Sequence, residues 1–99
     1  MAGPARSEAQ VATPKAQRYL AQLCKHFEHR LSVYRWDVNG TIAFPAGLCR
    51  LEAASDRLVL KAEAPDPQQL AELEGVVTRH LARFAFRDPP TVEWRRLSA

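Results

Sequence analysis

The chain has 99 residues, of which 46% are hydrophobic and 25% are charged, and its net charge is +3 at pH 7. This length is typical of a single domain spanning residues 1–99, in which we expect residues 1–6 to form a flexible N-terminal segment. No apolar run approaches the roughly 20 residues that cross a bilayer, and the N-terminus lacks the apolar stretch of a signal peptide. We therefore expect a cytoplasmic protein that does not associate with membranes.

The first predicted elements are a strand and a helix. Residues 7–12 alternate weakly between apolar and polar side chains, which predicts a short strand. Thr13 and Pro14 have the residue types of a helix N-cap and of the first helical position. We expect this helix to end near Arg30. Its apolar stripe comprises Ala16, Leu20, Leu23, Cys24 and Phe27.

Four strands are predicted next. Residues 31–38 are rich in β-branched and aromatic side chains and stop at Asn39-Gly40, a pair that predicts the tip of a hairpin. Residues 41–44, 48–54 and 57–64 predict three more strands, separated by turn-forming residues. Apolar and polar side chains alternate in the last two of these strands. The four strands therefore predict an antiparallel meander with one apolar face.

A second helix and a final strand complete the chain. Asp66 is the predicted N-cap, Pro67 occupies the first position, and Gln69 stands where a capping box has Glu or Gln. The apolar stripe of this helix comprises Leu70, Leu73, Val77, Leu81 and Phe84. Residues 91–96 predict the last strand.

The predicted order is β-α-β-β-β-β-α-β, which is an α+β fold. We expect a single antiparallel sheet, with the terminal strands added to the central meander. Because two amphipathic helices need a shared apolar surface, both should pack on one face of this sheet. The expected main core comprises Leu20, Leu23, Phe27, Leu60, Val77, Leu81 and Phe84.

Three segments carry a resemblance to a known family. They are residues 22–30 (QLCKHFEHR), 44–51 (FPAGLCRL) and 79–87 (RHLARFAFR), together with the opening residues 8–13 (EAQVAT). These segments resemble the small bacterial family called domain of unknown function 2218, and the resemblance covers nearly the whole chain. The resemblance implies a stand-alone cytosolic protein and, through relatives associated with siderophore-interacting flavoproteins, a context of iron or siderophore metabolism. It implies no catalytic residues.

The residues closest to a metal-site pattern are Cys24, Cys49 and His80. Thiolate and imidazole ligands suit zinc or iron, and all three residues are predicted on faces turned toward the core. His26 and His29 could share an ion, but two exposed histidines alone make a weak site. Because the chain lacks paired CxxC motifs and four-ligand spacing, we expect free, buried thiols and no metal.

The candidate ligand-binding residues are Cys49, Gly47, His80 and Cys24. Cys49 follows Pro45-Ala46-Gly47, where a ligand could approach the backbone. No serine or histidine occurs in the context of a nucleophile elbow, so catalytic residues stay unassigned and no cofactor is expected. The alternative to a binding role is a small enzyme or metal-binding protein that uses Cys49, Cys24 and His80.

Nucleic acid is a further partner class to consider, because the first helix carries a basic face. Tyr34, Trp36 and Trp94 could form a stacking platform on the sheet, but the chain lacks a recognised nucleic-acid-binding motif. We expect no nucleic-acid partner. The leading hypothesis is a non-enzymatic binding or accessory module whose partner is another protein or a second copy, with a small ligand as the alternative.

Overall fold

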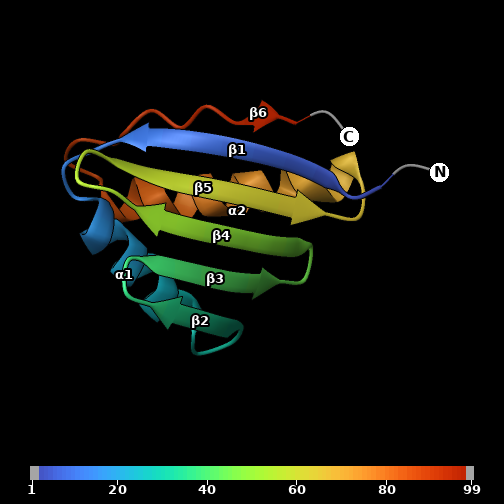
Figure 1. Cartoon of the computed structure of the whole chain (residues 1–99), viewed down its shortest axis with the longest axis horizontal. Helices are drawn as coiled ribbons and strands as arrows, with labels where there is room; N and C mark the ends of the chain where they lie inside the picture. The colour runs from blue at the N-terminus through green and yellow to red at the C-terminus, as the bar shows by residue number, and fades with distance from the viewer. Residues whose placement is uncertain (1–2, 98–99) are drawn as a thin grey trace.

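The computed structural model describes residues 3–97. Its elements are β1 (Ala5–Ala12), α1 (Ala16–Phe27), β2 (Ser32–Trp36), β3 (Asn39–Phe44), β4 (Gly47–Ala53), β5 (Arg57–Ala64), α2 (Pro67–Phe84) and β6 (Arg95–Arg96). All these strands form one antiparallel sheet in the order β2-β3-β4-β5-β1-β6, seen face-on in Figure 1. The predicted element order and the α+β class are confirmed.

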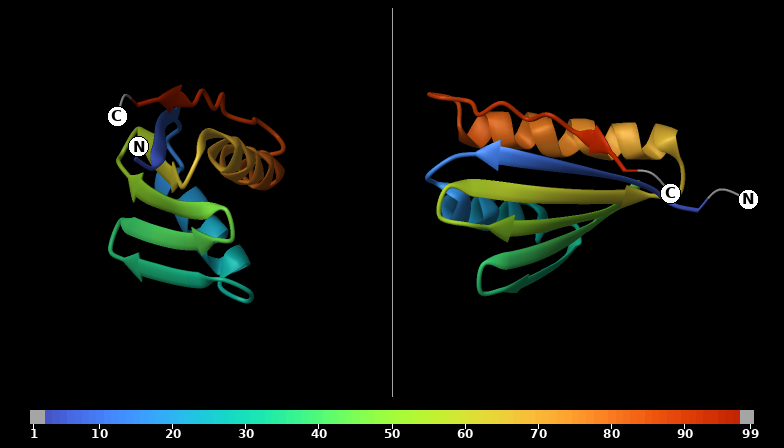
Figure 2. Two further views of the ribbon diagram at one scale, coloured as in Figure 1. Left: turned by 90° about the vertical axis from the view of Figure 1, so that its right-hand side faces the viewer. Right: turned by 45° about the horizontal axis from the view of Figure 1, so that its top comes forward.

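Both helices cover the same face of the sheet (Figure 2). Helix α1 packs on β2, β3, β4 and β5, whereas α2 packs on β4, β5 and β1, and the two helices touch each other. The expected arrangement of both helices on one face is therefore confirmed. Within residues 3–97, no helix combines the length and the apolar character needed to cross a bilayer.

One core fills the space between the sheet and the helices. Its fully buried large side chains are Leu20, Leu23, Ile42, Leu51, Leu58, Leu60, Leu70, Leu73, Leu81, Val11, Val77 and Cys49. Most of the predicted core is therefore confirmed, but Phe27 and Phe84 are only half-buried. Each is the last residue of its helix, so its ring lies at the margin of the helix layer.

The hairpin between β2 and β3 turns at a different place from the one predicted. Asp37 and Val38 form the turn, and Asp37 adopts the left-handed backbone conformation with φ of 55°. Asn39 and Gly40 belong to β3, where a Cβ atom on Gly40 would lie 2.8 Å from Cys24 Sγ. The prediction was wrong because Asp tolerates the left-handed region, and because this glycine admits α1 against the sheet.

Helix α1 is shorter than predicted at its N-terminal end. The hydroxyl of Thr13 accepts a hydrogen bond from the Lys15 backbone N–H (3.0 Å), but the helix begins only at Ala16. The backbone N–H of Thr13 donates to the Asp56 carbonyl oxygen (3.0 Å), which ties Thr13 to the turn between β4 and β5. Thr13 therefore closes a turn before the helix and is not its N-cap.

Helix α1 also ends at Phe27, before the predicted end at Arg30. The backbone N–H groups of Arg30 and Leu31 both donate to the Phe27 carbonyl oxygen, at 3.1 and 2.9 Å. These bonds tighten the chain into a turn that leads directly into β2.

Helix α2 begins where predicted. The Asp66 carboxylate accepts a hydrogen bond from the Gln69 backbone N–H (2.8 Å). The Gln69 side chain reaches back and donates to the other carboxylate oxygen of Asp66 (3.0 Å). Pro67 occupies the first turn, where its missing N–H leaves no helical bond unmade.

The terminal strands join the sheet as expected, but with different lengths. Strand β1 begins at Ala5, and both Ala5 and Arg6 pair with the end of β5, so these two residues do not belong to the flexible segment expected over residues 1–6. Residues 1–2 lie outside the described residues. Within the predicted last strand, residues 91–96, only Arg95 and Arg96 pair with β1.

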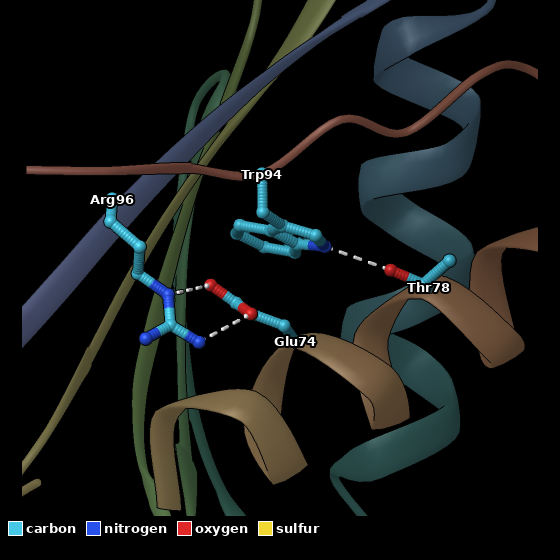
Figure 3. A network of polar contacts seen from close by, with 4 residues as sticks. All are labelled: Glu74, Thr78, Trp94 and Arg96. Atoms are coloured by element: carbon cyan, nitrogen blue, oxygen red, sulfur yellow. Dashed lines mark hydrogen bonds and ion pairs between the residues drawn. The ribbon is translucent and has the colours of Figure 1, made fainter. Parts of the chain in front are cut away.

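Two side chains of the last segment, Trp94 and Arg96, bind α2 (Figure 3). The indole N–H of Trp94 donates to the Thr78 hydroxyl (2.9 Å), and the Arg96 guanidinium donates to both Glu74 carboxylate oxygens (3.1 and 3.2 Å). These contacts draw Trp94 over the helix. Residues 91–94 therefore do not form the predicted strand.

Candidate functional site

A groove of about 940 Å³ lies where the end of α1, the turn between β3 and β4, and α2 come together. This volume falls in the range of sites that hold small organic ligands. The lining residues are His26, Phe27, His29, Arg30, Leu31, Phe44, Pro45, Ala46, Gln69, Glu72, Leu73, Val76 and His80. The groove is the strongest candidate for a functional site among the described residues.

The end of α1 borders the groove. Helix α1 ends at Phe27, whose ring contacts Phe44 at the end of β3. Pro45 and Ala46 then turn the chain from β3 into β4 and form one wall. The opposite wall is the α2 face that carries Val76 and His80.

Four aromatic rings form a connected cluster in the groove. The Phe27 ring lies 4.9 Å from Phe44, 4.8 Å from His80 and 4.8 Å from His26, measured between ring centroids. Its contacts with Phe44 and His26 have interplanar angles of 73° and 85°, which is the favoured edge-to-face arrangement. The cluster gives the groove an aromatic wall.

The His80 ring is oriented by its own helix. Its Nδ1 atom lies 2.8 Å from the Val76 carbonyl oxygen. A carbonyl oxygen only accepts hydrogen bonds, so Nδ1 carries the proton and donates it to this bond. In the neutral ring, Nε2 is then the nitrogen that can accept a hydrogen bond or a proton.

His26 lies beside His80, with ring centroids 4.9 Å apart and ring planes tilted by 48°. Desolvation lowers the pKa of His26 below its usual value although the side chain is exposed, and the positive charges of His80, Arg83, His29 and Arg30 lower this pKa further. Helices α1 and α2 thus bring two imidazoles together in a positively charged neighbourhood.

The charges that line the groove are unbalanced. His26, His29, Arg30 and His80 are basic, and Glu72 is the acidic lining residue. Within residues 3–97, neither Arg30 nor Glu72 takes part in an ion pair. The groove therefore combines an aromatic wall with the guanidinium donors of Arg30 and with imidazole groups that can donate or accept, which suits a ligand that has an apolar body and an acceptor group.

Of the candidate residues from the sequence, His80 lines the groove, whereas Cys24, Cys49 and Gly47 do not. Both cysteines are free and buried, as expected. Burial raises the pKa of the Cys49 thiol to about 12, with a smaller contribution from Cys24, and burial also raises the pKa of Cys24. Such thiols are poor nucleophiles, because the thiolate is the reactive form.

Gly47 has a packing role at the start of β4. A Cβ atom at this position would overlap the carbonyl oxygen of Glu63 and lie 3.0 Å from the Ala64 Cα atom. Its backbone is thus covered by β5 and not presented to a ligand. Among residues 3–97, no group of three or more His, Cys, Asp or Glu side chains is placed to hold a metal ion, so Cys24, Cys49 and His80 do not meet as ligands.

The exposed aromatic residues do not form a common platform. Tyr34 and Trp36 are 65% and 69% exposed on β2, at one edge of the sheet. Trp94 precedes β6 at the opposite edge and is bound to Thr78. The three residues proposed for stacking nucleic-acid bases are therefore separated by the width of the sheet.

Phe44 and Arg30 were not expected as site residues, and Phe27 was expected in the main core. These residues come from two elements and the turn that follows α1, so no spacing in the sequence links them. Two histidines at the end of a predicted helix, His26 and His29, were the available signal. Their meeting with His80 depends on how α1 and α2 pack.

Comparisons with known proteins place the chain in a family. Residues 8–95 match the model of a family described as "Uncharacterized protein conserved in bacteria (DUF2218)". The NMR structure of PA4090 from Pseudomonas aeruginosa is similar, with 34% sequence identity and a TM-score of 0.78 over 92% of this chain and 95% of that chain. A comparison with curated proteins finds no match. Because the match spans nearly the whole domain and a relative shares its fold, the chain belongs to the bacterial family DUF2218.

Proposed function

We propose that this protein is a non-enzymatic, cytoplasmic binding module whose groove holds a small ligand with a flat, apolar body. The observation that carries the proposal is the aromatic cluster of Phe27, Phe44, His80 and His26, which lines a groove of about 940 Å³. Aromatic rings gain from edge-to-face and stacked contacts with a flat ligand in addition to the burial of apolar surface.

The composition of the groove supports binding over catalysis. Among the described residues that line it, none is a serine, threonine, cysteine or lysine, which are the common nucleophiles. His80 is oriented by the Val76 carbonyl oxygen and not by a carboxylate. The arrangement therefore lacks the chain of nucleophile, base and orienting acid that activates a hydroxyl or thiol.

A place in iron or siderophore metabolism is the more specific part of the proposal. It rests on the resemblance to relatives associated with siderophore-interacting flavoproteins. The chemistry of the groove agrees with it in one respect: iron-binding catechols are flat aromatic groups with oxygen acceptors, and the groove offers aromatic contacts and several donors. A free catechol amide would then bind more tightly than the same amide without its hydroxyl groups.

The test of the binding role is an NMR titration of the ¹⁵N-labelled protein with 2-naphthamide, an uncharged flat ligand. We expect saturable shifts at residues of the groove. The Ala46→Trp substitution should abolish them, because the indole would fill the space beside Pro45. Ala82→Trp is the matched control, since Ala82 is an exposed residue of α2 that does not line the groove.

Two outcomes would contradict the proposal. Naphthamide could fail to shift groove residues of the folded protein, or the Ala46→Trp variant could bind it as well as the control. The iron context is tested separately with 2,3-dihydroxybenzamide against benzamide. Equal affinities for these two amides would remove the iron context and leave the binding role intact.

A further inference from the structure

We propose that His26 and His80 together select a carboxylate ligand, binding its anionic group with uptake of a proton by the imidazole pair. The inference rests on the proposed binding role of the groove and names the chemical class of its ligand: an aromatic or apolar carboxylic acid, bound as the anion.

The geometry of the pair carries the inference. The two rings come from different helices, lie 4.9 Å apart between centroids, and both rest on the Phe27 ring at 4.8 Å. Two imidazolium ions at this distance repel each other, so the pair does not hold two protons without a counter-charge. An anion placed beside the pair supplies that counter-charge.

The proton has a defined place on one of the rings. Because Nδ1 of His80 already donates to the Val76 carbonyl oxygen, a proton taken up by this ring resides on Nε2. The resulting N–H is a charge-assisted donor to a carboxylate oxygen. His26 lies beside this ring and places a second imidazole next to the bound anion.

The charged groups around His26 set the direction in which its pKa shifts. The groups that act on His26 are His29 and Arg30 from α1 and its turn, and His80 and Arg83 from α2. The turn between β3 and β4 contributes only Phe44, Pro45 and Ala46 to the groove, none of which is charged, and Glu72 is the acidic residue of the α2 wall. Desolvation and these cations lower the pKa of His26, so they oppose its protonation in the empty groove.

A bound carboxylate reverses this effect, because it stabilises the imidazolium form and raises the pKa of the pair. By linkage, affinity for the carboxylate then increases as the pH falls through the histidine range, as long as the ligand stays ionised. The same cations repel a divalent metal ion, so a bis-histidine metal site is the less favoured use of this pair.

The test compares 2-naphthoate with its uncharged counterpart 2-naphthamide in calorimetric titrations of the full chain. Between about pH 8 and about pH 5.5, we expect naphthoate affinity to rise about fivefold or more, and naphthamide affinity to stay constant. Calorimetry in buffers of different ionisation enthalpy should show proton uptake with naphthoate alone. In NMR spectra, naphthoate should raise the pKa of His26 and shift the ring signals of His80.

Two variants distinguish the effect of the His26–His80 pair on binding from that of the other basic residues that line the groove. His26→Gln, at an exposed position, should remove most of the pH dependence of naphthoate binding. Because this variant also loses one ring of the aromatic cluster, naphthamide binding should weaken, and by the same factor at pH 8 and at pH 5.5. His29→Gln is the matched control, because it removes another histidine that lines the groove. Naphthoate binding to this variant should keep its pH dependence.

Each contrary outcome is distinguishable. If naphthamide binds and naphthoate shows no rise in affinity at low pH, the carboxylate inference is overturned and the binding role stands. If neither ligand binds, both proposals fail. If Zn²⁺ alone binds stoichiometrically and shifts the signals of both His26 and His80, the pair is a metal site and the carboxylate inference is overturned.

Discussion

Gly40 and Gly47 lie where another part of the fold occupies the space that a side chain would take. At Gly40 the neighbour is the sulfur of Cys24 on α1, and at Gly47 it is the backbone of β5. Gly75, in contrast, lies inside α2, and a Cβ atom there would meet only the far end of the Arg79 side chain. The same residue type therefore has opposite consequences at these positions.

We expect Gly40→Ala to destabilise the protein by about 1–3 kcal/mol, the usual cost of overpacking a core. The new methyl group would lie 2.8 Å from Cys24 Sγ, and Cys24 is itself buried. Gly75→Ala should stabilise the protein by about 0.5–1 kcal/mol, because alanine favours the helix and the exposed Arg79 side chain can move. Urea unfolding of both variants checks these two predictions. A Gly40→Ala protein as stable as wild type would refute the close contact between position 40 and Cys24.

Cys49 gives a prediction about pH. Its pKa is about 12 in the folded chain, against an ordinary value of 9.0, because burial favours the neutral thiol. This contribution to stability is complete below pH 9.0 and is lost as the pH rises toward 12. Between about pH 7 and about pH 10, wild-type protein should lose about 1.4 kcal/mol more than Cys49→Ala does. Parallel losses in the two proteins, measured by urea unfolding, would show that Cys49 ionises freely in the fold.

At the scale of elements, the two helices differ in how their starts are secured. Helix α2 has a side-chain cap from Asp66, whereas α1 starts at Lys15 without one and depends on the Thr13 turn before it. The α2 start is encoded by adjacent residues alone. The α1 start depends on the attachment of Thr13 to the turn between β4 and β5.

Asp66→Ala should lower the melting temperature at neutral pH, because the Gln69 backbone N–H loses its acceptor. Asp66→Asn is the matched control and should keep much of the cap, since its amide oxygen can accept the same bond. Backbone and side-chain hydrogen bonds from Gln69 lower the pKa of Asp66 below its ordinary value of 3.8. The carboxylate's contribution is therefore present above that value and lost as the pH falls below it, so wild type and Asp66→Ala should converge in acid. A difference that persists unchanged in acid would argue against a role for the charge.

At the scale of the whole molecule, stability depends on one core between a sheet and a single layer of helices. Helix α2 packs on the central strands β4, β5 and β1, and Leu81 is fully buried at this contact. Phe84, one turn later, lies at the margin of the same layer and faces the His26 ring at 5.7 Å. The position of a side chain within the layer therefore matters more than its size.

We expect Leu81→Ala to cost about 2–5 kcal/mol, the range for large-to-small substitutions in a core. Phe84→Ala should cost less although it removes a larger side chain, because the ring is already partly in solvent and water can fill the space. Denaturant unfolding of both variants measures which of them loses more stability. A larger loss for Phe84→Ala would mean that the end of α2 is more enclosed than the structure shows.

Local patterns were sufficient for much of the fold. Alternation in residues 48–64 predicted most of the buried side chains of β4 and β5, with Val59 as an exception that is buried on the other face of the sheet. Helical spacing placed Leu20, Leu23 and Leu81 in the core. The start of α2 was also predicted, because the cap depends on residues that are neighbours in the chain. The family resemblance is confirmed by the match over residues 8–95.

The sequence by itself determined the order of the elements and which of their faces are apolar, since both properties depend on residues within a few positions of each other. Only the tertiary structure decided that Gly40 admits α1, that Trp94 is bound by α2 instead of continuing a strand, and that His26 meets His80. Each of these contacts joins residues far apart in the chain, so its geometry depends on how whole elements pack. The groove is of the same kind: α1, α2 and one turn of the sheet each supply part of its wall, and no single segment encodes it.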